Sequence, residues 1–313
     1  MNSSETIDEQ LLLELGEAPS IRRAIRLFEV VGMPARNLKE RTREEYGKDL
    51  RLLAAFCEAQ GRLQAEQLTL PLMEAYLAEM DRRGYASASR QRKTYAIRAF
   101  LSFLFRQGLI RQDIGRRLIP PRRTQKEPRF LSRAEYQALM AACEHHPRDA
   151  AIIELLLQTG IRRSEVVRLT IDDILELPER PTADPDNVGL LHVHRGRDKE
   201  ETIPLNYKAC VALQRYLAVR PASDLRALFL SRHGAPLSPR AVLNAVKGYA
   251  AAAGVPNVGV HTLRHTHGTH HVLQGTDLHT LQANMGHASV STTELYLGLA
   301  GRARRKALQE HAL

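Results

Sequence analysis

The sequence predicts a mainly α-helical protein with one small β-hairpin or sheet, an α+β fold in two domains. Three observations predict this class. Helical periodicity of apolar residues runs through most of the chain, a proline-rich basic segment interrupts it, and one pair of neighbouring segments alternates in the manner of strands. A chain of 313 residues is long enough for two domains with separate cores.

The first half of the chain predicts amphipathic helices. The segment "RTREEYGKDLRLLAAFCEAQG" opens with a Thr42/Glu45 capping box and stops at Gly61, and two more helices fit "LPLMEAYLAEMDRRG" and "SASRQRKTYAIRAFLSFLFRQG". Residues 1–35 carry a further helical pattern, which we expect to form an N-terminal extension. The apolar stripes consist of Tyr46, Leu50, Leu53, Ala54 and Cys57 in the first helix and of Ile97, Leu101 and Leu104 in the third.

The segment "IPPRRTQKEPRFLSRAE" separates the two predicted domains. It combines three prolines with dense positive charge, which is typical of a linker. A capping box formed by Ser132 and Glu135 then predicts that a new helical domain begins near residue 131. The expected organisation is an extension over 1–35, a helical domain over 36–120, a basic linker over 121–130 and a second domain over 131–313.

The second domain is predicted to be helical with one hairpin. "GLLHVHRG" and "EETIPLN" alternate around the charged turn "RGRDKE", which predicts two antiparallel strands. Helices are expected over "YKACVALQRYLAVRP", over "SPRAVLNAVKGYAAAAG" with Pro239 in its first turn, and over "HTLRHTHGTHHVLQG" and "DLHTLQANMG".

Composition limits the classes of function. Lys and Arg outnumber Asp and Glu by 45 to 35, and the sequence pI is about 9.8, so we expect a polyanionic partner, either nucleic acid or an anionic membrane surface. No apolar run is long enough to span a bilayer, and the acidic N-terminus does not resemble a signal peptide. We therefore expect a cytoplasmic protein. The three cysteines have no paired spacing, which argues against disulfides and cysteine metal sites.

Basic residues gather in the first domain and the linker. We expect them to face the phosphates of a nucleic acid, because Lys and Arg supply most contacts to a nucleic-acid backbone. The alternative, a solvated helix face, explains an isolated basic cluster equally well. The candidate DNA-binding residues are Arg90, Arg92, Lys93, Arg122 and Arg123.

Polar residues in the second domain form a pattern suited to phosphoryl transfer. "TGIRRSEVVRL" places Arg162 between two apolar helices, and "HTLRH" places His261 and Arg264 on one helix face. Two guanidinium groups match the oxygens of a phosphate, and imidazoles transfer protons near neutral pH. "MGHASVSTTELY" adds His287 and Tyr296, whose hydroxyl is a weak nucleophile until it loses its proton.

In this order the motifs resemble those of the tyrosine recombinase (phage integrase) family, closest to its Xer type, from about residue 36 to the C-terminus. The resemblance implies a two-domain clamp on DNA, made of a core-binding, SAM-like helical domain and a tyrosine recombinase catalytic domain. It implies that Glu165 helps to position the first arginine. The catalytic residues it implies are Arg162, His261, Arg264, His287 and Tyr296.

The reaction implied by the resemblance is site-specific DNA strand exchange. Tyr296 would attack a phosphate to give a 3′-phosphotyrosine and a free 5′-hydroxyl, with His261 as base and His287 bound to the phosphate. Bond energy is conserved, so no cofactor is implied. The implied partners are double-stranded DNA and a homo- or hetero-tetramer of recombinase subunits on two DNA sites, in which the C-terminal segment docks on a neighbour. The alternative is that this segment packs on its own domain.

The resemblance leaves the biological role open. Chromosome dimer resolution and mobile-element integration or excision are both compatible with it, and either would place the protein at the nucleoid. Two other functions remain as alternatives: a DNA-binding protein on the same scaffold without cleavage, and a type IB topoisomerase-like enzyme.

One departure concerns the family's catalytic lysine, which lies in the β-hairpin. Counting back from "IPL", its expected place falls on Gly196. We nominate Lys199, the lysine of this turn, although one inserted residue would bring Arg195 into register instead. The alternative is that Lys199 is a solvated turn charge.

The histidine-rich segment "HTLRHTHGTHHVLQG" invites a metal-binding interpretation. His261/His265 and His267/His271 have the helical spacing of two ligands on one face, but neither pair encloses the Glu of a zinc hydrolase motif. We therefore expect no functional metal here.

Overall fold

The chain forms two compact units, residues 1–126 and 127–313, in a computed structural model. The structure describes residues 19–122, 129–195, 199–277, 280–281 and 285. The division between the units falls inside the segment 121–130 that the sequence assigns to the linker. Helices dominate, and a three-stranded sheet lies in the second unit, so the predicted mainly α fold class is confirmed.

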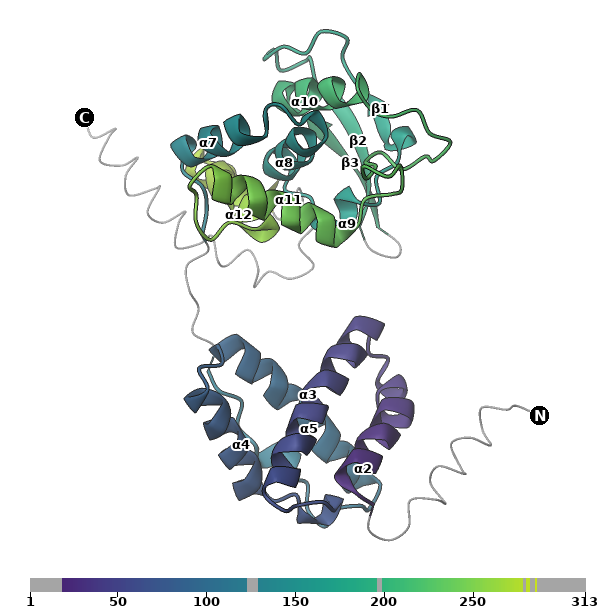
Figure 1. The fold of residues 1–313 in the computed structure, drawn as a ribbon, viewed down its shortest axis with the longest axis vertical. Coiled ribbons are helices and arrows are strands. Elements are labelled where there is room, and N and C mark those ends of the chain that lie inside the picture. The colour runs from purple at the N-terminus through teal and green to yellow at the C-terminus, as the bar shows by residue number, and fades with distance from the viewer. Residues whose placement is uncertain (1–18, 123–128, 196–198, 278–279, 282–284, 286–313) are drawn as a thin grey trace, which may run out of the picture. The chain divides into compact units, whose positions relative to one another are not determined.

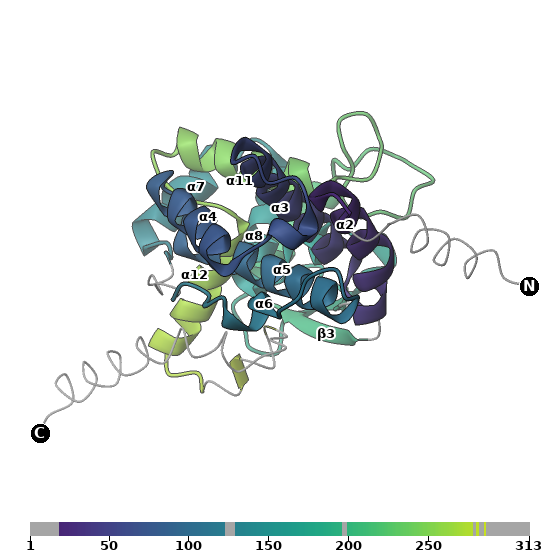
Figure 2. The same cartoon turned by 90° about the horizontal axis from the view of Figure 1, so that it is seen from below.

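The first unit is a bundle of helices of different lengths. Helix α6 packs beside α5, as Figure 2 shows. The described helices are α2 (Ile21–Leu27), α3 (Glu40–Ala59), α4 (Leu70–Arg82), α5 (Ser87–Arg106) and α6 (Ile114–Arg117), with short turns at Phe28–Gly32, Pro34–Arg36 and Ala65–Gln67.

The core of the first unit joins the predicted stripes of α3 and α5. Leu50 of α3 and Leu101 of α5 are fully buried, whereas Tyr46 is only half-buried. The ring of Phe28, in the turn after α2, packs against two rings of α5: its centroid lies 5.7 Å from that of Phe100 and 5.2 Å from that of Phe103. Residues from Ile21 onward thus belong to this core, although the sequence assigned them to an extension.

The start of α3 differs from the prediction. The helix begins at Glu40 and its N-cap, Lys39, makes no side-chain cap bond. The predicted capping box is therefore wrong: Thr42 lies inside the first turn, and Glu45 pairs with Lys48 at 3.0 Å rather than with the helix start. Asn37 turns the chain before this helix with a positive φ of 50°, a conformation that Asn tolerates.

The second unit is built around helix α8. Most residues of α8 are buried, and the helix contacts α7, α10, α11 and α12 (Figure 1). Its helices are α7 (Arg133–Cys143), α8 (Pro147–Thr159), α9 (Arg163–Val166), α10 (Tyr207–Leu217), α11 (Pro239–Ala252) and α12 (Val260–Leu273).

Local sequence signals set several helix starts in this unit. The capping box of Ser132 and Glu135 is confirmed at the start of α7. Pro239 lies in the first turn of α11 as predicted, because a proline has no N–H to leave unbonded there. The helix expected over "DLHTLQANMG" lies largely outside the described residues. In the part of the chain that the structure describes, no helix is long and apolar enough to cross a membrane.

The sheet has the order β1-β2-β3 and is antiparallel. The predicted hairpin is confirmed as β2 (Gly189–His194) and β3 (Glu200–Leu205), with His194 opposite Glu200. The sequence missed β1 (Ile174–Glu176), because three residues are too few for a recognisable alternation. A single 3₁₀ turn, η4 (Ile171–Asp173), leads directly into β1.

Candidate active site

Arg162 is positioned by the end of helix α8. Gly160 terminates α8 in the left-handed conformation at φ 63°, which turns the chain so that Arg162 becomes the N-cap of α9. A side chain at Gly160 has no room, since a Cβ atom there would lie 2.7 Å from the ring of His267.

Glu165 fixes the first arginine. Its carboxylate accepts one hydrogen bond from the Arg162 backbone N–H and one from the Arg162 guanidinium, both 2.7 Å long. The Glu165 side chain is 4% exposed, whereas that of Arg162 is 37% exposed. The guanidinium is therefore held from inside the protein while part of it faces solvent, as the sequence predicted for this pair.

Arg264 connects three segments of the chain. It lies on α12 and is only 7% exposed. Its guanidinium donates to the backbone carbonyl of Gly160, at the end of α8, and to that of Met285 at 2.5 Å. Met285 lies two residues before His287. His287 and Tyr296 themselves lie outside the described residues.

His261 lies one turn before Arg264 on α12. Partial desolvation lowers the pKa of its imidazole, and the nearby charges of Arg264, Arg163 and Arg162 lower it further. The imidazole is therefore neutral at pH 7 and can accept a proton. Because both predicted arginines act on this pKa, Arg162 and Arg264 each lie within electrostatic reach of His261.

The hairpin brings Arg195 within electrostatic reach of Arg162 and Glu165. Lys199 is exposed at the turn. Arg195 is buried, and its Nε lies 2.5 Å from a carboxylate oxygen of Glu201. Desolvation lowers the pKa of Arg195, the carboxylates of Glu201 and Glu165 oppose this, and the charge of Arg162 lowers it further. A one-residue insertion in the turn was the sequence signal that pointed to Arg195.

The basic cluster of the first unit is engaged in ion pairs. Arg90 lies 2.7 Å from Asp81, and Asp49 accepts from Arg92 at 2.5 Å and from Lys93 at 2.6 Å. Lys93 is only 5% exposed, so it does not lie on the surface that the sequence suggested. The physical reason is its pairing with the buried Asp49, which sequence spacing does not reveal. Of the two linker arginines, Arg122 is exposed and Arg123 lies outside the described residues.

Metal-binding side chains gather elsewhere. Among the described residues, one group of three such side chains lies close together: Asp173, His192 and His194, around η4 and β2. The histidines of α12 are not part of it. His267 instead hydrogen-bonds through Nδ1 to the carbonyl of Leu157 at 3.0 Å, and burial lowers its pKa to about 3.

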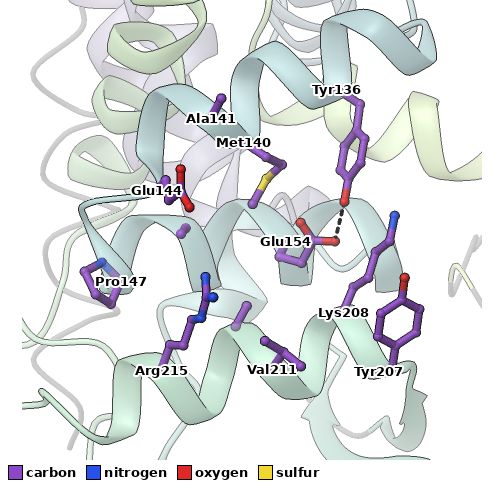
Figure 3. Close-up of a pocket in the computed structure, with 12 residues that line it drawn as sticks. Tyr136, Met140, Ala141, Glu144, Pro147, Glu154, Tyr207, Lys208, Val211 and Arg215 are labelled. Atoms are coloured by element: carbon purple, nitrogen blue, oxygen red, sulfur yellow. Dashed lines mark hydrogen bonds between the residues drawn. The ribbon is translucent and has the colours of Figure 1, made fainter. Parts of the chain in front are cut away.

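A cavity of about 460 Å³ lies between α7, α8 and α10 (Figure 3). Its wall is largely apolar, with Met140 and Val211 among the lining residues. At one end the Tyr136 hydroxyl donates to Glu154 at 2.9 Å, and the Lys208 ammonium lies 4.8 Å from the centre of the Tyr136 ring. Such a cavity suits an apolar side chain with a polar group beside it.

Two family descriptions match the chain. Residues 129–301 match the phage integrase family, and residues 33–108 match the phage integrase N-terminal SAM-like domain. Among curated proteins, the tyrosine recombinase XerC of Mycobacterium sp. (strain KMS) is 33% identical over 292 residues, covering 88% of this chain and 94% of the relative. XerC of Mycobacterium tuberculosis (strain CDC 1551 / Oshkosh) is 35% identical over 285 residues, covering 87% and 92%.

Solved recombinase structures share the fold. XerH bound to a palindromic difH substrate, in a post-cleavage complex, aligns with a TM-score of 0.70 at 19% identity, covering 95% of this chain and 86% of that one. A lambda integrase tetramer bound to a Holliday junction aligns with a TM-score of 0.72 at 16% identity, covering 91% and 79%. Together with the family matches and the XerC relatives, the fold and the Arg162–Glu165, His261 and Arg264 arrangement lead to one conclusion: the chain belongs to the phage integrase family and is an enzyme of the tyrosine recombinase class.

Proposed function

We propose that this protein is a site-specific recombinase that cuts and rejoins double-stranded DNA through Tyr296. The observation that carries the proposal is the convergence of Arg162, held by Glu165, with Arg264 and a neutral His261. Rigid, permanently charged donors next to a proton acceptor suit the transfer of a phosphodiester without a metal.

In the proposed reaction the Tyr296 oxygen forms a bond to the scissile phosphorus, and the bond from phosphorus to the 5′-oxygen breaks. The tyrosine proton passes to His261, and the leaving 5′-oxygen takes up a proton. Arg162 and Arg264 stabilise the charge that develops on the phosphate oxygens, and His287 adds a hydrogen bond to it. The 5′-hydroxyl of the exchanged strand then attacks the 3′-phosphotyrosine and restores a phosphodiester.

Either hairpin cation could assist the leaving group. Lys199 is the candidate general acid, because an ammonium releases its proton more readily than a guanidinium does. The burial of Arg195 and its interaction with Arg162 and Glu165 favour it as a stabiliser of charge instead. We propose Arg195 as the hairpin residue that acts at the phosphate, with Lys199 as the alternative.

The two domains are proposed to close on DNA as a clamp joined by the linker over 121–130. The net charge of +10 supports this, since each phosphate neutralised by Lys or Arg releases counterions. Arg90, Arg92, Arg122 and Arg123 remain the proposed phosphate contacts. Lys93 would have to leave Asp49 before it could join them.

The active assembly is proposed to be a homo- or hetero-tetramer on two DNA sites. The structural relative on a Holliday junction is a tetramer, which supports this proposal. The segment 301–313 would dock on a neighbouring subunit. The cavity between α7, α8 and α10 of that neighbour is a candidate binding site for the apolar side chains of the segment. The XerC relatives support an Xer-type role at the nucleoid, either in chromosome dimer resolution or in the movement of a genetic element.

A denaturing gel of the protein with nicked fragments of its own genome tests the proposal, beside the Tyr296→Phe variant. A DNA band whose shift survives detergent, needs Tyr296 and needs no metal would support it. Tight binding by both proteins without an adduct would instead favour the alternative of a DNA-binding protein that does not cleave. A second assay with supercoiled plasmid addresses the topoisomerase alternative, since only that activity relaxes DNA without a specific site.

A further inference from the structure

We propose that the turn η4 and strand β2 form a zinc-binding site from Asp173, His192 and His194, with Glu200 as a neighbouring carboxylate. Each of Asp173, His192 and His194 offers one donor atom, and these atoms lie within 4.8 Å of one another. None of them belongs to the residues proposed for catalysis, and the inference does not depend on the proposed function.

Strand geometry places both imidazoles on one face of the sheet. Successive side chains of a strand point to opposite faces, so His192 and His194 share a face while Val193 between them is buried in the core. Their ring centres lie 4.9 Å apart in an edge-to-face arrangement. Two histidines so spaced present one nitrogen each to a common point outside the sheet.

Asp173 is oriented before any ion arrives. Its Oδ2 accepts hydrogen bonds from the Thr170 N–H at 2.7 Å and from the Thr170 hydroxyl at 2.9 Å. Its Oδ1 lies 3.5 Å from Nε2 of His194. The carboxylate is buried, so a cation beside Oδ1 would offset the cost of desolvating its charge.

Glu200 brings a second carboxylate from β3. It lies opposite His194 in the strand register, with Oε1 at 3.1 Å from Nδ1 of His194 and Oε2 at 3.5 Å from Nε2 of His192. Its side chain is largely exposed and can therefore rotate toward an ion or remain a partner of the histidines.

The donor set favours zinc. Two imidazole nitrogens and a carboxylate oxygen, with one position open for water or Glu200, match a four-coordinate zinc site, whereas magnesium and calcium prefer oxygen ligands alone. Bonds of about 2.0–2.2 Å put the donors of such a site about 3.4 Å apart, so small side-chain rotations would bring the present atoms into range. Two carboxylates and two neutral imidazoles also balance the charge of a divalent cation.

The consequence of this site would be structural. His194 and Glu200 are the strand pair next to the turn, and Arg195 directly follows His194, so an ion held by β2 and η4 would anchor the turn end of the hairpin, where Arg195 lies. The competing explanation is that the histidines pair with Asp173 and Glu200 without any metal.

The test measures zinc binding by the full-length protein after removal of metals with a chelator. Isothermal titration with zinc chloride should give about one equivalent, and cobalt substitution should give the intense visible absorption of a four-coordinate ion. The double variant His192→Gln/His194→Gln should lower zinc affinity at least about 100-fold, since outer-shell changes alone cost 10–100-fold. Asp173→Asn is the second, milder variant, and it should lower affinity at least about tenfold.

The matched control is His270→Gln/His271→Gln, which removes the same number of imidazoles from α12. It should bind zinc as the parent protein does, and thermal melts in chelator establish that each variant is folded. Loss of binding in this control with retention in the β2 variant would overturn the site, and so would equal binding by all variants or no binding by the parent.

Discussion

Replacing Arg195 by Ala tests which hairpin cation acts at the phosphate. The Arg195 side chain is 4% exposed, whereas that of its partner Glu201 is 33% exposed. The variant removes a buried cation and leaves the carboxylate of Glu201, which water can reach, so the free energy of unfolding should fall by less than the about 3–5 kcal/mol that breaking a fully buried pair costs. Cleavage should slow further, because removing one preorganised donor costs about 10²–10³ in rate.

The assay is single-turnover cleavage of a nicked DNA fragment that the adduct gel has identified. Lys199→Ala is the matched control, since Lys199 lies on the same hairpin but is exposed, and it should cleave at the parent rate. DNA affinity, measured by gel mobility shift, should change little in either variant. A cleavage defect in Lys199→Ala together with normal cleavage by Arg195→Ala would refute the reasoning and return the role to the lysine.

Three further predictions concern the same unit. Gly160→Ala should lower the free energy of unfolding by about 2 kcal/mol or more, because Gly160 has a positive φ and a Cβ atom there would lie 2.7 Å from His267. Denaturant titrations measure this loss. The control is Gly254→Ala, because Gly254 also has a positive φ but open space around it. Burial lowers the pKa of His267 to about 3 in the folded protein, so as the pH falls from about 6.5 toward 3 the unfolded chain takes up this proton and the folded chain does not. The free energy of unfolding therefore decreases over this pH range. His267→Gln should make the plot of unfolding free energy against pH flatter there, and an unchanged slope would contradict the prediction. The pKa of His261 is lowered from its ordinary value of 6.5, so the cleavage rate should begin to fall only at a pH below 6.5, where the imidazole becomes protonated. Arg163→Ala removes a positive charge that lowers this pKa, so the fall in cleavage rate should move to higher pH.

Local signals made much of the fold predictable. The Ser132–Glu135 capping box fixes the start of α7 because both partners lie within one turn of the same helix. The hairpin was predictable for the same reason, since its two strands are neighbours in sequence and alternate clearly. The core stripes of α3 and α5 required only the helical period and apolar residue types.

The predictions that failed depend on distant partners. Lys93 is buried because Asp49, on another helix, accepts its hydrogen bond. Strand β1 exists because β2 pairs with it, and its own three residues carry no pattern. The motifs identify Arg162 and Arg264, but which hairpin cation is buried depends on contacts with Glu201 and Glu165 that no local rule supplies.

The bonds of Arg264 give one physical reason why the site needs an arginine at this position. The guanidinium is planar and carries five N–H donors in fixed directions, so one side chain can bond the carbonyls at Gly160 and Met285 together. A lysine at this position would gather its three donors on one nitrogen, whereas the guanidinium donates to the two carbonyls from two separate nitrogens, Nη1 and Nη2. Because Met285 precedes the segment that carries His287 and Tyr296, the same guanidinium that is proposed to bind the phosphate also ties the start of the nucleophile's segment to α8 and α12. Binding of the phosphate and placement of the nucleophile are then coupled through one side chain, so a change at Arg264 would alter both together.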